Sequence, residues 1–135
     1  MSTILVAADA KWVRDQVKSA CVSPGTRVVE VTNGQDVRRA VLEYEPEIVV
    51  LDMQIANMGG IATAIDLRLE GAAGRLPDVS ILLLLDREAD RFLAKRADAD
   101  AELLKPVDAS TLARAVERLA AAGAVSTGES DTVEG

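Results

Sequence analysis

The chain has 135 residues, a length that fits one domain with its own hydrophobic core. Its formal charge of −7 and its near lack of aromatic side chains argue against nonspecific nucleic-acid binding, which needs a positive field and stacking surfaces. Without histidine and with Cys21 as the single cysteine, the sequence offers no internal disulfide and disfavours a zinc site.

The start of the chain, STILVAAD, lacks a basic region followed by a long apolar segment, so no signal peptide is predicted. No apolar run approaches the roughly 20 residues that a membrane-spanning helix requires. These features predict a cytoplasmic protein that contacts no membrane.

Short apolar runs alternate with amphipathic stretches along the chain. Such runs are typical of parallel strands covered on both faces, and they predict strands at 4–9, 27–32, 47–52, 78–86 and 101–104. Apolar residues at helical spacing predict helices at 11–21, 35–45, 59–71 and 89–97, and a last one that begins with Asp108 as its N-cap. Five successive β-α units predict an α/β fold with a parallel sheet between two helix layers.

Several side chains carry more specific predictions. Trp12 is expected to pack beside the first helix, and Cys21 to lie in the core. The segment 123–135 is small, polar and acidic, which predicts a disordered tail because it lacks the apolar area that offsets ordering entropy. Four residues of the third helix are expected to face the core: Ile61, Ala64, Ile65 and Leu69.

Charged residues follow four of the predicted strands. Asp9, Asp52, Asp86 and Lys105 each stand at or just after a strand end. In open parallel sheets the functional crevice lies beyond the carboxyl ends of the strands, where the strand order reverses. The sequence therefore predicts a site with Asp52 at this edge.

This arrangement resembles the receiver domain of two-component response regulators, the CheY-like family. The resemblance covers residues 3–121 and rests on Asp9, on VVLDMQIANMGG around the third strand, and on LLKPVD after the fifth. It implies a flavodoxin-like (βα)5 three-layer sandwich with strand order 2-1-3-4-5. The corresponding domain boundary is 1–122, followed by the tail.

By this resemblance, Asp52 is the phosphoacceptor and Lys105 contacts the phosphoryl oxygens. Asp9, Asp52 and the backbone carbonyl of Gln54 are the implied Mg²⁺ ligands, and the Lys105–Pro106 peptide bond is implied to be cis. The chemistry is consistent, because phosphoryl transfer to a carboxylate needs its negative charge neutralised by a hard cation on oxygen ligands.

Three positions depart from the family pattern. Ala8 stands where the family has the first of two adjacent acids, which implies weaker Mg²⁺ binding. Leu85 takes the place of a hydroxyl residue, and Glu102 that of the switch aromatic. A lost hydrogen bond to a charged group costs about 1.5–3 kcal/mol, a large part of the roughly 5.5 kcal/mol that moves a two-state protein from 1:99 to 99:1. The usual conformational switch is therefore not expected.

Asp86 has two interpretations. It either caps the helix that follows the fourth strand, or lies at the mouth of the site, where it shapes access or substitutes for the missing carboxylate. The sequence leaves both open.

Two functions follow from the resemblance. The first is a stand-alone, atypical receiver that accepts a phosphoryl group on Asp52 and signals through protein–protein contact; the alternative is a phosphorylation-independent pseudo-receiver that acts as a constitutive interaction module. The predicted partners are a histidine kinase or phosphotransfer protein and an unidentified downstream protein, with the chain as a monomer or weak homodimer. No enzyme is predicted, because a haloacid-dehalogenase-type phosphatase would need an acid at position 54, where Gln54 stands.

Overall fold

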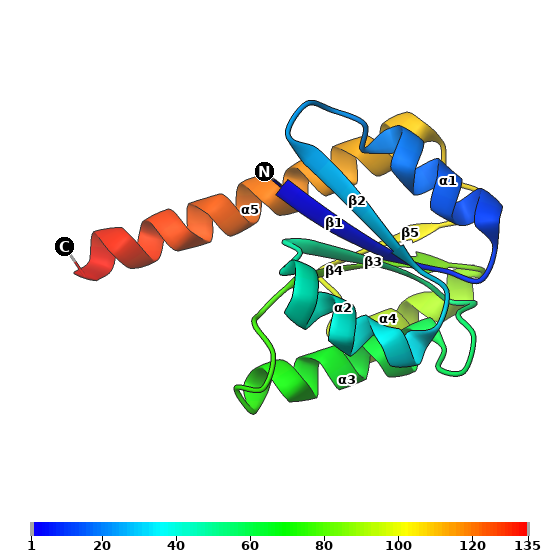
Figure 1. The fold of residues 1–135 in the computed structure, drawn as a ribbon, viewed down its shortest axis with the longest axis horizontal. Helices are drawn as coiled ribbons and strands as arrows, with labels where there is room; N and C mark the ends of the chain where they lie inside the picture. Colours follow the sequence, from blue (N-terminus) through cyan, green and yellow to red (C-terminus); the bar gives the residue numbers. More distant parts are fainter. Residues whose placement is uncertain (1, 135) are drawn as a thin grey trace.

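The computed structural model describes the backbone of residues 2–134 and the side chains of residues 2–123. Five parallel strands form one sheet in the order β2-β1-β3-β4-β5 (Figure 1). The strands are β1 (Ser2–Ala7), β2 (Thr26–Val31), β3 (Ile48–Asp52), β4 (Ser80–Leu85) and β5 (Ala101–Leu104). This order confirms the predicted flavodoxin-like fold.

Helices cover both faces of the sheet. The α-helices are α1 (Lys11–Ala20), α2 (Val37–Tyr44), α3 (Gly60–Ala72), α4 (Arg91–Arg96) and α5 (Ala109–Glu134). Two short 3-10 helices, η1 (Gly34–Asp36) and η2 (Glu88–Asp90), precede α2 and α4. Helices α1 and α5 lie on one face, while α2, α3 and α4 lie on the other, which gives the predicted three layers (Figure 1).

The core has two halves because successive strand residues point to opposite faces. In β4, Leu82 and Leu84 pack with α1 and α5, whereas Leu83 and Leu85 pack with the helices of the other face. A parallel strand between two helix layers must be apolar at nearly every position. The run ILLLL in β4 meets this requirement without a polar interruption.

The predicted inward face of α3 is partly wrong. Ala64 is buried and Ile61 packs against the core, but Ile65 and Leu69 are exposed, with Leu69 63% accessible. Thr63 and Leu67 are buried instead, and the Thr63 hydroxyl donates to the carbonyls of Met58 and Gly59. Apolar residues occur on more than one side of this helix, so their spacing alone does not show which side faces inward.

Three other local predictions can be compared with the structure. Cys21 is buried as expected, and Asp108 caps α5 by accepting a hydrogen bond of 2.7 Å from the Thr111 amide. The prediction for Trp12 is wrong, because its side chain lies on the surface with 58% of the residue exposed. Position 12 is on the outer side of α1, whose buried residues are Val13 and Val17.

Helix α5 continues to Glu134, past the body of the domain in Figure 1. The side chains of 124–135 lie outside the described residues, so the disordered tail predicted for 123–135 stays a prediction, as does the domain boundary. In the part of the chain that the structure describes, no helix is both long and apolar enough to cross a bilayer.

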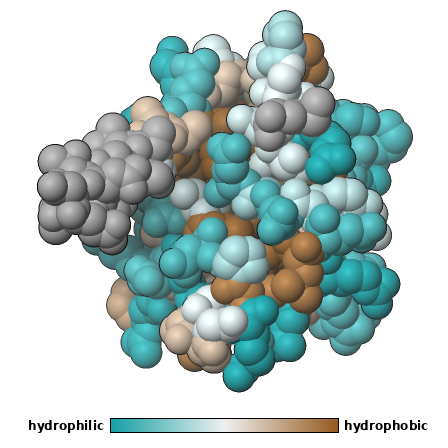
Figure 2. Space-filling view, turned by 60° about the vertical axis from the view of Figure 1, so that its left-hand side comes forward, coloured by the Kyte–Doolittle hydropathy of each residue, from teal (hydrophilic) through white to brown (hydrophobic). Residues whose placement is uncertain are grey.

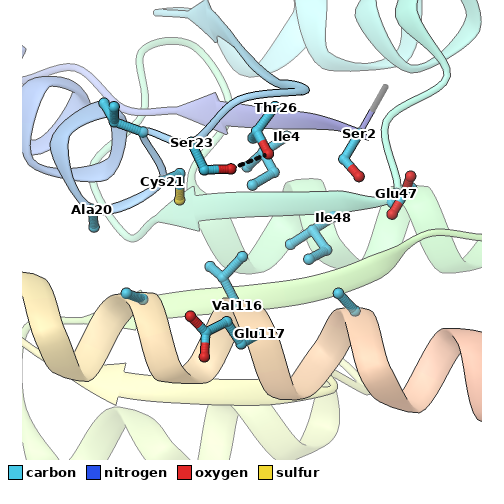
Figure 3. Close-up of a pocket in the computed structure, with 13 residues that line it drawn as sticks. Ser2, Ile4, Ala20, Cys21, Ser23, Thr26, Glu47, Ile48, Val116 and Glu117 are labelled. Atoms are coloured by element: carbon cyan, nitrogen blue, oxygen red, sulfur yellow. Dashed lines mark hydrogen bonds between the residues drawn. The ribbon is translucent and has the colours of Figure 1, made fainter.

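A pocket of about 210 Å³ lies where the strands begin, between the end of α1 and α5 (Figure 3). Ser2, Ile48, Cys21 and Val116 are among its lining residues. Figure 2 faces this side of the molecule and shows hydrophobic residues near its centre, bordered by hydrophilic ones. The predicted site residues do not line this pocket, because they lie at the opposite ends of the strands.

Candidate functional site

The predicted site forms where β3, β4 and β5 end. Asp52 is the last residue of β3 and is only 1% exposed, while Asp86 and Lys105 directly follow β4 and β5. The ladder continues to these ends, since the Met53 amide donates to the Leu84 carbonyl and the Lys105 amide to the Leu85 carbonyl at 2.8 Å. Parallel pairing therefore carries the three charged side chains to one place.

Lys105 joins two carboxylates. Its ammonium is hydrogen-bonded to Asp52 Oδ1 and lies 2.7 Å from Asp86 Oδ1. The side-chain amide of Gln54 donates to the other oxygen of Asp86 at 3.1 Å. The Lys105–Pro106 peptide is cis, as the resemblance implied.

Asp86 contacts Lys105 and Gln54, and the interpretation as a helix cap is wrong. The following turn, η2, begins with Arg87 as its N-cap, whose amide donates to Asp90 Oδ2 at 3.0 Å. Asp86 instead belongs to the group of Asp52, Lys105 and Gln54, where its side chain is 34% exposed. The sequence predicts that Asp86 lies at the end of a strand, but it does not show which side chain Asp86 contacts.

The two carboxylates differ in electrostatic environment. Burial raises the pKa of Asp52, although the Lys105 ammonium offsets part of this effect. The hydrogen bond from Lys105 lowers the pKa of Asp86, assisted by Gln54. Burial acts to lower the pKa of Lys105, but its hydrogen bonds to Asp52 and Asp86 outweigh burial, so the pKa is raised. At neutral pH Lys105 is therefore charged, and its ammonium interacts with both carboxylates.

Asp9 lies in the loop after β1, beside the loop after β3. Its backbone amide donates to the carbonyl of Gln54 at 2.9 Å, which brings the two loops together, and its side chain is exposed. The structure therefore places Asp9, Asp52 and the Gln54 carbonyl at one edge of the sheet. That carbonyl already accepts one hydrogen bond and has a second lone pair.

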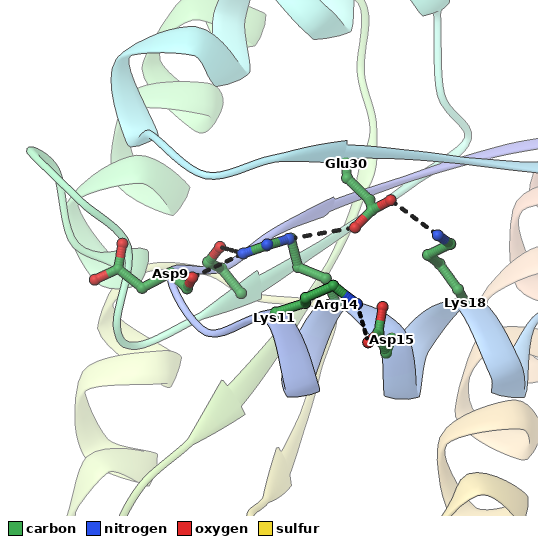
Figure 4. A network of polar contacts seen from close by, with 7 residues as sticks. Asp9, Lys11, Arg14, Asp15, Lys18 and Glu30 are labelled. Carbon is green, nitrogen blue, oxygen red and sulfur yellow. Dashed lines mark hydrogen bonds and ion pairs between the residues drawn. The ribbon is translucent and has the colours of Figure 1, made fainter.

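Arg14 is a functional candidate that sequence reasoning missed. Its Nη1 donates to the carbonyls of Ala8 and Asp9 at 2.9 and 2.7 Å, and its Nε to Glu30, which also pairs with Lys18 (Figure 4). These bonds fix the loop that carries Asp9. Nothing in the sequence marks the fourth residue of α1 as a loop anchor, because its partners in the loop are backbone carbonyls.

The three departures have distinct environments. Ala8 is fully buried among core residues on the α1 and α5 side. Leu85, also fully buried, packs on the opposite face. Glu102 is partly buried in β5 and accepts from Arg91 of α4 at 3.2 Å. That these three positions correspond to the acid, the hydroxyl residue and the switch aromatic of the family stays a prediction of the resemblance.

Gly60 allows close packing under the site. A Cβ at this position would collide with the carbonyl oxygen of Asp52, since the start of α3 lies directly against the end of β3. We expect Gly60→Ala to lower the free energy of unfolding by about 1–3 kcal/mol, because an overpacked site must shift backbone. Urea denaturation measures this loss.

Gly59→Ala is the matched control. A Cβ at Gly59 would lie 3.6 Å from the Met53 carbonyl oxygen, which is an ordinary contact. Its free energy of unfolding should change by less than about 0.5 kcal/mol. Equal unfolding midpoints for the two variants would contradict the close approach of Gly60 to Asp52.

The residues at this edge suit Mg²⁺ in donor type. Mg²⁺ binds hard oxygen ligands and keeps several waters, so one or two carboxylates suffice; Asp9, Asp52 and the Gln54 carbonyl supply such oxygens. Among residues 2–123, no three His, Cys, Asp or Glu side chains gather closely enough to hold a metal. A cation here would therefore depend on carbonyl and water ligands as well as carboxylates.

A five-stranded parallel sandwich with a buried strand-end aspartate, paired to a lysine after the last strand, defines a receiver domain. The model of the response regulator receiver domain matches residues 4–117, and the chain belongs to this family. Receiver domains are signalling modules that generally bind Mg²⁺ in an acidic pocket, and response regulators interact with histidine kinases or phosphotransfer proteins.

Curated relatives include short and long proteins. Protein PilH of Pseudomonas aeruginosa is 26% identical over 121 residues, which cover 90% of this chain and 99% of PilH. The nitrate/nitrite response regulator protein NarL of Escherichia coli is 30% identical over 122 residues, covering 89% of this chain and 55% of NarL. The match to the Haemophilus influenzae homolog of that regulator covers 43% of the homolog. The chain therefore spans about half the length of these longer proteins.

Solved structures show the same fold. NtrX from Brucella abortus superposes with a TM-score of 0.82 at 20% identity, over 98% of this chain and 30% of NtrX. The chemotaxis protein CheY4 of Vibrio cholerae gives a TM-score of 0.75 at 19% identity, over 88% of this chain and 98% of CheY4.

Proposed function

We propose that this receiver domain accepts a phosphoryl group on Asp52 from a histidine kinase or phosphotransfer protein, with Mg²⁺, and signals in the cytoplasm by contact with another protein. The observation that carries the proposal is the ion pair between Asp52 and Lys105. A nucleophilic carboxylate and a positive charge for the incoming phosphoryl oxygens stand together at a sheet edge, where parallel folds place their sites.

The transfer is a single displacement. A carboxylate oxygen of Asp52 forms a bond to phosphorus while the bond from phosphorus to the donor nitrogen breaks, and the donor histidine keeps the electron pair. Lys105 pairs with the negative oxygens of the group in flight. Asp9, Asp52 and the Gln54 carbonyl would hold Mg²⁺, which supplies charge neutralisation when bound. Arg14 keeps the Asp9 loop in place through the carbonyls of Ala8 and Asp9.

The pseudo-receiver is the second candidate, and one observation favours it. Leu85 is a fully buried core residue where ordinary receivers present a hydroxyl. Under this alternative Asp52 is structural, and partner binding proceeds without phosphate.

A small phosphodonor separates the two functions. The chain is incubated with acetyl phosphate and Mg²⁺, and intact mass is measured for wild type, Asp52→Asn and Asp78→Asn. We expect the mass of one added phosphoryl group on wild type and none on Asp52→Asn, because an amide is a poor nucleophile. Asp78 is exposed and lies before β4, so its variant is the matched control and should be modified like wild type.

The dependence on Mg²⁺ and a comparison with an ordinary receiver complete this test. Asp9→Asn should raise the Mg²⁺ concentration that gives half-maximal modification, because one oxygen ligand is lost. A wild-type chain that stays unmodified while an ordinary receiver is modified under the same conditions would support the pseudo-receiver.

A further inference from the structure

The contact between Asp86 and Lys105 has no role in the proposed phosphoryl transfer. Lys105 Nζ lies 2.7 Å from Asp86 Oδ1 and also contacts Asp52. The Gln54 side chain holds the second oxygen of Asp86 at 3.1 Å. The Lys105 ammonium therefore bridges Asp86 and Asp52, the residue that would carry the phosphoryl group.

A phosphoryl group on Asp52 would change the charge balance at this point. A phosphorylated side chain carries about −1.5 to −2 charge and strong acceptor oxygens, which compete with Asp86 for Lys105. Two like charges brought close together repel, and they do so more strongly near a protein surface than in bulk water. The Asp86 carboxylate would then lose its cation and face a second anion.

Asp86 is also connected to the rest of the α4 surface. It opens the short segment that becomes η2, where Arg87 and Asp90 are joined by a backbone-to-carboxylate hydrogen bond. The next residue, Arg91, pairs with Glu88 at 2.6 Å and with Glu102 of β5 at 3.2 Å. A displaced Asp86 would therefore move a segment that is tied to both α4 and β5.

We propose that Asp86 is the switch residue of this receiver: a phosphoryl group on Asp52 takes Lys105 from it, and the expelled carboxylate carries the 86–91 segment to a second position. Leu85 offers no hydroxyl and Glu102 no aromatic ring, so the charged residue beside them supplies the moving group. This inference rests on the proposed function of Asp52.

The test follows backbone amide NMR signals of the full chain during titration with beryllofluoride and Mg²⁺, a stable mimic of the phosphorylated state. In wild type we expect shifts around Asp52 and Lys105 and a second set over 86–91 and Glu102. Asp86→Asn should bind beryllofluoride about fivefold or more tightly, the low end of measured couplings between sites, and lose the second set. Asp78→Asn, with the same charge change at the other end of β4, should behave like wild type.

Each result supports or overturns the inference. Shifts over 86–91 that persist in Asp86→Asn, or weaker binding by that variant, overturn it. Wild-type shifts confined to Asp52 and Lys105 also overturn it while leaving the proposed function intact. Binding by Asp86→Asn alone also overturns it, because the wild type would then not bind the group that is proposed to displace Asp86. Silence in both chains rejects phosphoryl acceptance itself, and the inference falls with it.

Discussion

Asp52→Asn is expected to raise the free energy of unfolding at neutral pH, while it removes the proposed phosphoacceptor. The carboxylate is 1% exposed, and burial raises its pKa despite the neighbouring lysine. An amide of the same shape avoids placing a second charge in this environment, and Lys105 keeps Asp86 as its partner. The functional residue is thus predicted to lower stability.

The effect depends on pH in a defined direction. Since the folded pKa of Asp52 lies above the value of about 3.9 for an unfolded aspartate, the folded protein holds a proton where the unfolded chain has lost it. The free energy of unfolding therefore falls as pH rises through this window. On acidification through the raised pKa the wild type takes up the proton, so the advantage of Asp52→Asn should shrink. Urea denaturation at several pH values measures both effects.

Asp86→Asn provides a contrast of opposite sign. Its pKa is lowered by the hydrogen bond from Lys105, so its ionised form stabilises the fold above the unfolded pKa and loses this contribution as pH falls through the folded pKa. The Asp86→Asn variant should therefore be less stable than wild type at neutral pH. A destabilised Asp52→Asn at neutral pH would contradict the electrostatic assignment of the site.

Leu85→Thr is expected to lower the stability of the fold and to raise the affinity for beryllofluoride. Leu85 is fully buried, so the shorter polar side chain should lower the free energy of unfolding by about 2–4 kcal/mol. The substitution also places a hydroxyl at the end of β4, whose last carbonyl accepts from the Lys105 amide. A hydrogen bond to a charged group contributes about 1.5–3 kcal/mol, so beryllofluoride should bind about tenfold more tightly or better.

Leu83→Thr is the matched control for this substitution. Leu83 is equally buried, on the same face of the same strand, two residues further from the site. Denaturation should show a comparable loss for both variants, and only Leu85→Thr should gain affinity in a beryllofluoride titration. Equal affinities would place the family's hydroxyl position elsewhere.

The fold was predictable because its signals are long and redundant. Five apolar runs and the helices between them specify the topology. Residues at strand ends, such as Asp52 and Lys105, then lie at the same edge of the parallel sheet, independently of the loop conformations. The buried face of α3 was harder to predict, since Ile65 and Leu69 are as apolar as the buried Leu67 and the sequence does not distinguish them.

Within the site, sequence reasoning found residues but not their partners. Asp52 and Lys105 were predicted from strand ends and resemblance, and their ion pair is present. The bond from Gln54 to Asp86 and the anchoring of the Asp9 loop by Arg14 depend on side-chain directions across loops distant in sequence. No spacing rule encodes such contacts.

The leucine run in β4 leaves its own alignment poorly determined. A slip by one residue would exchange leucine for leucine on both faces, so apolar burial alone hardly opposes it, although such shifts are normally costly. The side chain of Asp86 can distinguish the two alignments, because it contacts Lys105 in the observed one. This acid therefore also serves as a positional marker for the most hydrophobic strand of the protein.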